Sequence, residues 1–200
     1  MHTKTFKKTS VLIFSGSNDR AIIAFCRFAQ KKDINFLIIA RNKKDNIFKT
    51  IYRTNVIHTR NKEKINITDI IEYIKIARTK SGLTQKNTIL ILPATEYINR
   101  ILCSNVKKLK KINICTGLPN KKIYEMVSDK FSFSKICKNF GIKTPSEYRN
   151  IPNKFPFVIK PKKYQNFKKI IDKPAIINNA KELNTYWLKK QKKIIIFKNL

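Results

Sequence analysis

Residue types that carry covalent or metal chemistry are scarce in this chain of 200 residues. The histidines are His2 and His58, and the cysteines are Cys26, Cys103, Cys115 and Cys137. No two cysteines have Cys-x-x-Cys spacing, so neither a zinc site nor a Cys–His nucleophile is supported. Each cysteine lies in an apolar or helical stretch. We predict free thiols packed as small apolar side chains, in keeping with a reducing cytoplasm.

A turn that could receive an anion follows the first apolar run of the chain. Ser15-Gly16-Ser17 separates that run from a stretch with helical spacing. At such a place, backbone N–H groups and a helix N-terminus can point at an anion. Asn18 and Ala21, however, stand where a dinucleotide-binding loop has its second and third glycines. We interpret the segment as an ordinary tight turn, with a ligand contact as the alternative.

Positive charge dominates the composition. Lys and Arg number 44 against 12 Asp and Glu, which gives a formal net charge of +32. Apolar residues make up 42% and charged residues 28%, so the composition is not that of a disordered chain. Two interpretations stay open: a solvated basic surface produced by compositional drift, and a surface that binds a polyanion. On charge alone, ATP, nucleic acid and an anionic membrane would all be attracted.

No stretch of the sequence resembles a targeting or membrane-spanning segment. The apolar run after the basic N-terminus, residues 11–14, has only four residues. A signal peptide needs a longer apolar region, and a membrane helix needs about 20 residues. We therefore expect a cytoplasmic protein without a membrane span.

The first part of the chain alternates between two hydrophobic periods. Short apolar runs predict strands at residues 10–14, 35–40, 55–59, 88–92 and 112–115. Helical spacing predicts helices at residues 19–30, 67–79 and 95–104. Strands that alternate with helices imply βαβ units with right-handed crossovers, so we predict a Rossmann-like parallel sheet.

The pattern changes after Gly117-Leu118-Pro119. Two helical stretches are followed by a strand, a second strand, a helix and a last strand, at residues 121–127, 129–140, 155–161, 175–178, 180–190 and 194–197. Gly141 and Pro145 are well placed to end the second helix. We predict two domains, an α/β domain at residues 1–120 and an α+β domain at residues 121–200.

Motifs within residues 128–162 follow one another in a recognisable order. Asp129-Lys130 opens a helix, Gly141-Ile142 ends it, and Phe155-Pro156, a β run and Lys160-Pro161 come next. This order resembles the start of an ATP-grasp domain, as in biotin carboxylase, carbamoyl phosphate synthetase and related carboxylate–amine ligases. The matching positions are Asp129, Lys130, Gly141, Ile142, Pro145, Phe155, Pro156, Val158, Ile159, Lys160 and Pro161. The family places a Rossmann-like pre-ATP-grasp domain ahead of this start, so the resemblance covers most of the chain.

The resemblance implies which residues hold a nucleotide. In the family, a basic residue near the start of the helix and another at the end of the strand contact ATP, which assigns that role to Lys130 and Lys160. Lys173 precedes a β run in the same way as in some branches, and it is a third phosphate-binding candidate. A triphosphate needs cations fixed on rigid elements, and a strand or a helix end provides them.

The chain also departs from the family pattern. Residues 162–172 contain no glycine where a Gly- and Ser-rich loop is usual, and Phe197 and Lys198 stand where Gln and Glu are expected. The magnesium ligands of the family, a Glu and a Glu-x-Asn, would lie beyond residue 200. We therefore expect an ATP-binding protein truncated before its magnesium-binding half, with Mg²⁺ bound only alongside that missing part. No catalytic residue is assigned, and enzymatic activity is left open.

Two other functions remain possible from the sequence. Lysine pairs that alternate with Tyr164, Phe167, Tyr186 and Trp187 can bind nucleic acid or another polyanion without catalysis, unless these aromatic residues belong to the core. The chain can also form a homo- or hetero-oligomer through an unfinished sheet, because residues 194–197 would be an apolar strand without a partner.

Overall fold

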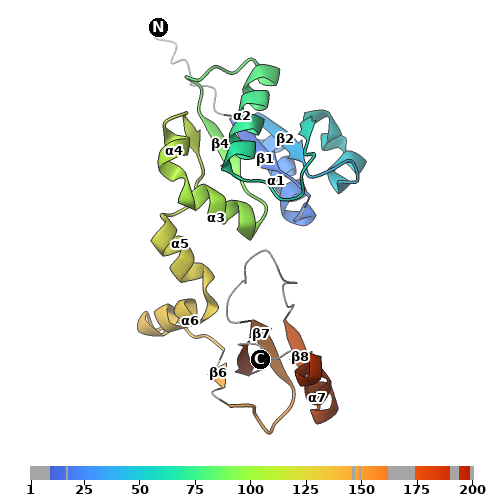
Figure 1. The fold of residues 1–200 in the computed structure, drawn as a ribbon, viewed down its shortest axis with the longest axis vertical. Coiled ribbons are helices and arrows are strands. Elements are labelled where there is room, and N and C mark those ends of the chain that lie inside the picture. Colours follow the sequence, from blue (N-terminus) through green and yellow to red (C-terminus); the bar gives the residue numbers. More distant parts are fainter. Residues whose placement is uncertain are drawn as a thin grey trace. The chain divides into compact units, whose positions relative to one another are not determined.

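A computed structural model of the protein describes residues 10–16, 18–145, 147–148, 150–161, 174–189 and 194–198 (Figure 1). The chain divides into two compact units, residues 1–121 and 122–200. This division falls inside the stretch 117–128, where the sequence pattern changes. Each unit is described separately below.

The first unit is built on a parallel sheet of five strands. The strands are β1 (Ser10–Phe14), β2 (Phe36–Ala40), β3 (Val56–Thr59), β4 (Ile89–Leu92) and β5 (Ile114–Cys115). Their order in the sheet is β3-β2-β1-β4-β5, and all neighbours run parallel. The strand order reverses direction between β1 and β4, as it does in Rossmann-like α/β folds. The predicted parallel sheet is confirmed.

Alternate side chains of each strand enter different cores, because successive residues of a strand point to opposite faces. On β1, Leu12 and Phe14 belong to one buried cluster, and Val11 and Ile13 belong to the other. All five residues of β1 are buried. A central parallel strand covered on both faces reads as a continuous apolar run, which is why it was recognisable in the sequence.

Helices cover both faces of this sheet. On the Val11 face, α1 (Asp19–Lys31) contributes Ile22, Cys26 and Ala29. On the Leu12 face lie α2 (Ile67–Ser81), α3 (Glu96–Ser104) and α4 (Val106–Lys110). The 3₁₀ turns η1 (Asn46–Lys49) and η2 (Ile51–Asn55) and the helix α4 were not predicted. They are too short to show a hydrophobic period.

The second unit contains helices followed by an antiparallel sheet of four strands. The helices are α5 (Lys121–Ser128), α6 (Lys130–Asn139) and α7 (Ala180–Lys189), and the strands are β6 (Glu147–Tyr148), β7 (Phe157–Pro161), β8 (Ala175–Ile177) and β9 (Ile194–Lys198). Phe157, Ile159 and Ile177 form a small buried core. Only β6 was not predicted, because a strand of two residues has no readable alternation. The helices and longer strands agree with the sequence analysis, but agreement of elements does not by itself identify an ATP-grasp domain.

The strand β9 corrects one expectation. The sheet order is β6-β9-β7-β8, so β9 lies in the interior of the sheet. Its backbone pairs antiparallel with β7 from Phe157↔Lys198 to Pro161↔Ile194, and with β6 on its other side. The expectation that residues 194–197 form an unpaired strand is therefore wrong. Backbone N–H and C=O groups need partners, and β9 finds them on both sides. This removes the argument for assembly through that strand.

Among the residues that the structure describes, none of the helices has the length and apolar character needed to cross a membrane.

Candidate functional site

The helix α6 begins at Lys130 because the preceding residue, Asp129, caps it. The side chain of Asp129 accepts a hydrogen bond from the backbone N–H of Ser132 at 2.9 Å, which satisfies an otherwise unpartnered donor at the start of the helix. At the other end, Gly141 has φ +68°, and the N–H of Ile142 donates to the carbonyl of Cys137 at 2.8 Å. The predicted termination at Gly141 is confirmed, because glycine adopts this left-handed conformation without strain.

Lys160 lies on β7, which pairs on both sides in the sheet. Lys160 is paired with Ile195 of β9, and Phe157 and Ile159 on the same strand are fully buried. Side chains alternate along a strand, so Val158 and Lys160 share the face opposite the Phe157 core. Val158 and Lys160 are both partly buried. The backbone of Lys160 is paired with β9, one residue beyond the part of β7 that also pairs with β8.

The structure brings Lys130 and Lys160 near each other. The pKa of Lys130 is lowered first by burial and second by the positive charge of Lys160, while Asp129 acts in the opposite direction. Lys130 is partly buried at the start of its helix. Two cations from different elements therefore share one neighbourhood, and the carboxylate of Asp129 only partly offsets them.

This arrangement can bind an anion. Two ammonium groups close to each other raise each other's free energy, and an anion between them reverses that effect. The N-terminus of α6 adds the positive end of its dipole, although the Asp129 side chain already accepts from the N–H of Ser132 there. A phosphate group, which accepts several hydrogen bonds, matches this combination.

The remaining predicted residues cannot be placed in the site. Lys173 and residues 162–172 lie outside the described residues, as do the side chains of Phe197 and Lys198. The aromatic residues Tyr164 and Phe167, and the side chains of Tyr186 and Trp187, also lie outside them. The lysine assignment therefore rests on Lys130 and Lys160.

A magnesium site does not fit the residues at hand. Among the described residues, no group of three or more His, Cys, Asp or Glu side chains could hold a metal ion. Mg²⁺ prefers oxygen ligands such as carboxylates, and among the described groups that shift the pKa of Lys130 the one carboxylate is Asp129. No chemical step through a metal ion is derived for this chain.

The turn after β1 is locked by its own surroundings. The Ser15 hydroxyl donates to Asp45 Oδ2 at 2.7 Å, and the backbone N–H of Arg41 donates to the same oxygen at 2.8 Å. Arg41 Nη1 donates to the carbonyl of Gly16 at 3.0 Å, and Arg60 Nη2 donates to the carbonyl of Ser15 at 2.8 Å. A Cβ on Gly16 would lie 2.2 Å from Arg41 Cβ. These contacts favour the structural interpretation at Ser15 and Gly16; Ser17 lies outside the described residues.

The sequence analysis missed the partners of this turn. Arg60 is buried, and burial is the main cause that lowers its pKa; the nearby charge of Arg41 adds to the lowering, whereas Tyr73 and Asp45 oppose it. Arg41 also forms an ion pair with Glu63. These residues come from separate segments of the chain, so no local motif could have identified the cluster.

The cysteines require a second correction. All four are free, and Cys26, Cys103 and Cys137 are buried as expected, but Cys115 is exposed. Burial raises the pKa of the Cys26 thiol to about 11. Cys115 lies on β5, which is the edge strand of the first sheet as formed by the described residues. The expectation of four packed thiols is wrong at this position.

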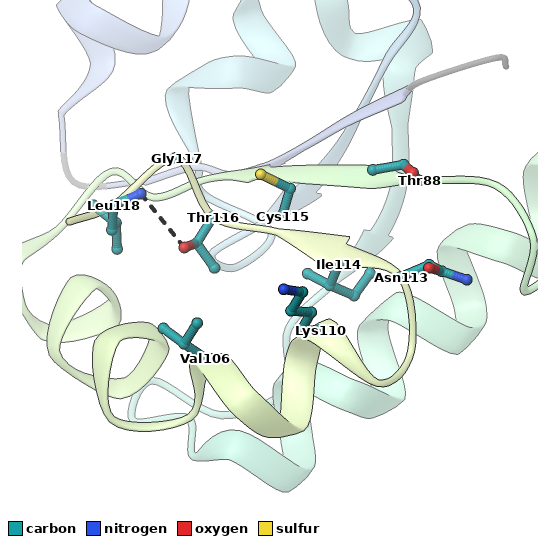
Figure 2. Close-up of a pocket in the computed structure, with 9 residues that line it drawn as sticks. All are labelled: Thr88, Val106, Lys110, Asn113, Ile114, Cys115, Thr116, Gly117 and Leu118. Carbon is teal, nitrogen blue, oxygen red and sulfur yellow. Dashed lines mark hydrogen bonds between the residues drawn. The ribbon is translucent and has the colours of Figure 1, made fainter. Parts of the chain in front are cut away.

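A pocket of about 390 Å³ lies beside β5 (Figure 2). Its apolar lining includes Val106, Ile114 and Leu118, and its polar lining includes Lys110, Cys115 and Thr116. The sequence offered no signal for this site. Lys110 stands in a lysine-rich stretch, and nothing distinguishes it there from its neighbours.

No known protein family matches the chain, and no curated protein matches it. The functional argument therefore rests on the residues and contacts described above.

Proposed function

We propose that the second unit binds the phosphate groups of ATP through Lys130 and Lys160, as expected of a protein that resembles ATP-grasp ligases. One observation carries the proposal: a lysine at the first residue of α6 and a lysine on β7 interact through their charges. These are the two positions to which the sequence resemblance assigns ATP contacts.

The physical argument starts from the cost of holding two cations together. Partial burial and mutual repulsion both disfavour the charged form of Lys130. Selection for stability alone would favour a neutral side chain at one of the two positions. An anionic ligand offsets the cost, because a charge-assisted hydrogen bond is about twice as strong as a neutral one.

The order of elements favours ATP over other anions. A capped helix, a glycine stop, a strand carrying Lys160, a further strand, a helix and a last strand follow one another as in the start of an ATP-grasp domain. In a complete ligase of that class, ATP phosphorylates a carboxylate and a nucleophile then displaces the phosphate. The proposal for this chain is confined to nucleotide binding.

Calorimetric titration of the whole protein with ATP tests the proposal. The variants Lys130→Gln and Lys160→Gln should each weaken ATP binding by about 10- to 100-fold, the loss expected for one charge-assisted contact. Lys138→Gln is the matched control, because Lys138 is an exposed lysine in the last turn of the same helix. It removes the same charge and should leave the affinity nearly unchanged.

Two outcomes would contradict the proposal. If all three variants lose affinity equally, the protein attracts ATP through its net charge and has no site at Lys130 and Lys160. If the unmodified protein does not bind ATP, the assignment of these lysines is wrong. Far-ultraviolet circular dichroism of each variant separates loss of binding from loss of fold.

A second function is favoured by the exposed lysines around α4. Lys107, Lys108, Lys110 and Lys111 are all exposed on or next to this short helix. We propose this face as the alternative, a surface that binds nucleic acid through phosphate contacts. The logarithm of its affinity for single-stranded DNA should then fall linearly with the logarithm of salt concentration. Binding that is insensitive to salt would remove this alternative.

A further inference from the structure

The pocket beside β5 belongs to the first unit and lies apart in sequence from the two lysines of the nucleotide proposal. It is lined by residues of α4 and β5 and of the loop that follows β5. Its volume of about 390 Å³ is near the lower end of the range of small-molecule sites. The pocket therefore suits a small ligand rather than a nucleotide or a polymer.

The walls of the pocket are mainly apolar. Val106 comes from α4, Ile114 comes from β5, and Leu118 follows the strand. Figure 2 draws Val106 and Leu118 extending toward the same space. A ligand that fills this space must present an apolar body, because burying polar groups against such walls without hydrogen bonds is unfavourable.

One lysine supplies the charge of the lining. Lys110 lines the pocket from the end of α4, and Figure 2 shows its side chain directed toward β5. Within the described part of the chain, its ammonium group forms no hydrogen bond or ion pair with another residue. The hydroxyl groups of Thr88 and Thr116 also belong to the lining. The ammonium group of Lys110 can receive one anionic head group.

We propose that this pocket binds a small organic monoanion, with an apolar body against Val106, Ile114 and Leu118 and a carboxylate or sulfonate on Lys110. A single ammonium group balances a single negative charge. Phosphate and polyphosphates carry more charge than this lining offers cations for, so they fit less well. The proposal is independent of ATP binding, because it uses different residues in the other unit.

Cys115 provides a built-in probe of the pocket. It is the exposed thiol among four free cysteines, and it belongs to the lining. We would measure the rate at which N-ethylmaleimide, a neutral reagent, alkylates Cys115 in the whole protein, using hexanoate as the ligand. At a hexanoate concentration of about ten times Kd, the rate should fall roughly tenfold, since only the unliganded fraction reacts.

Two variants in α4 distinguish a direct contact between the ligand and Lys110 from attraction by the overall positive charge. Lys110→Gln should raise the apparent Kd of hexanoate, as measured by protection of Cys115, by roughly 10- to 100-fold. Lys108→Gln removes the same charge from α4 at a residue outside the lining. Hexanoate should protect Cys115 in this variant as well as it does in the unmodified protein. Hexanamide matches the shape of hexanoate without its charge, and it should protect poorly.

Several results would overturn the proposal. One is that hexanoate does not protect Cys115. Another is that hexanamide or inorganic phosphate protects Cys115 as well as hexanoate does. A third is that Lys110→Gln and Lys108→Gln change the protection equally. As a second check, Val106→Trp should fill the pocket and abolish protection with an unchanged circular dichroism spectrum. Protection that survives in Val106→Trp would place hexanoate elsewhere, and it would contradict the proposal as well.

Discussion

Lys130 and Lys160 come from different elements, α6 and β7, yet the positive charge of Lys160 lowers the pKa of Lys130. Lys130 is also partly buried, and burial is the larger cause of the lowering. An anion beside the pair would oppose both effects, because it favours the charged form of Lys130. The protonation of Lys130 should therefore respond to a bound anion, and it can be measured.

Removing the charge of Lys160 should raise the pKa of Lys130. In Lys160→Gln the repulsion disappears, but burial remains, so the pKa should move toward its ordinary value without reaching it. The pH dependence of Lys130 acetylation, followed by mass spectrometry, reports this shift. The exposed Lys138 should show no change. An unchanged Lys130 profile would mean that the two charges do not interact.

ATP affinity should fall as the pH rises through the lowered pKa of Lys130. A phosphate bound beside Lys130 would raise that pKa, so binding would take up a proton wherever the free side chain is neutral and the bound one is charged. Above about pH 8 the phosphates are fully ionised, so their own titration does not contribute. The loss should therefore begin below 10.5, the ordinary lysine value. Affinity measured by calorimetry that stays constant until that value would count against Lys130 as a ligand.

Gly16→Ala should destabilise the first unit by about 2–5 kcal/mol, from left-handed backbone strain plus the clash. Gly16 has φ +96°, and its added Cβ would lie 2.2 Å from Arg41 Cβ. Gly82→Ala is the matched control, because Gly82 has φ +64° with nothing within 4 Å of the added Cβ. It should cost about 1–2 kcal/mol from strain alone. Urea unfolding measures the free energy of unfolding of both variants. Equal losses would mean that the turn at Gly16 rearranges to accommodate the added Cβ.

Protonation of Asp69 should lower the stability of the first unit at low pH. Its pKa is lowered below 3.8, first by the hydrogen bond from the backbone of Asn66 and then by Lys62, which lies 2.9 Å away. A carboxylate whose pKa is lowered by folding contributes to the stability of the folded state. This contribution is complete above the pKa of the unfolded state, and it is lost as the pH falls through the pKa of the folded state.

The comparison with Asp69→Asn isolates this contribution. The variant should be less stable than the unmodified protein near neutral pH, and the two should converge in strong acid, where Asp69 is protonated. Urea unfolding at both pH values gives the difference. A difference that does not change with pH would mean that the capping geometry, rather than the charge of Asp69, stabilises α2.

The sequence by itself determined most elements of the two units. The continuous apolar run at β1 appears because both faces of a central parallel strand are buried. The stop of α6 is readable because the backbone of Gly141 needs a left-handed conformation, and glycine adopts it most easily. These are local properties, so short windows of sequence contain them.

Only the tertiary structure decided which distant residues meet. Lys130 and Lys160 are two among many lysines, and the interaction of their charges depends on where the folded chain places α6 and β7. The interior position of β9 and the exposure of Cys115 likewise depend on which strands pair and which edges stay open. Hydrophobic periodicity reports which face of an element is buried, but it does not report the partner. The partner depends on the path of the whole chain, and so the sites became visible only in the folded protein.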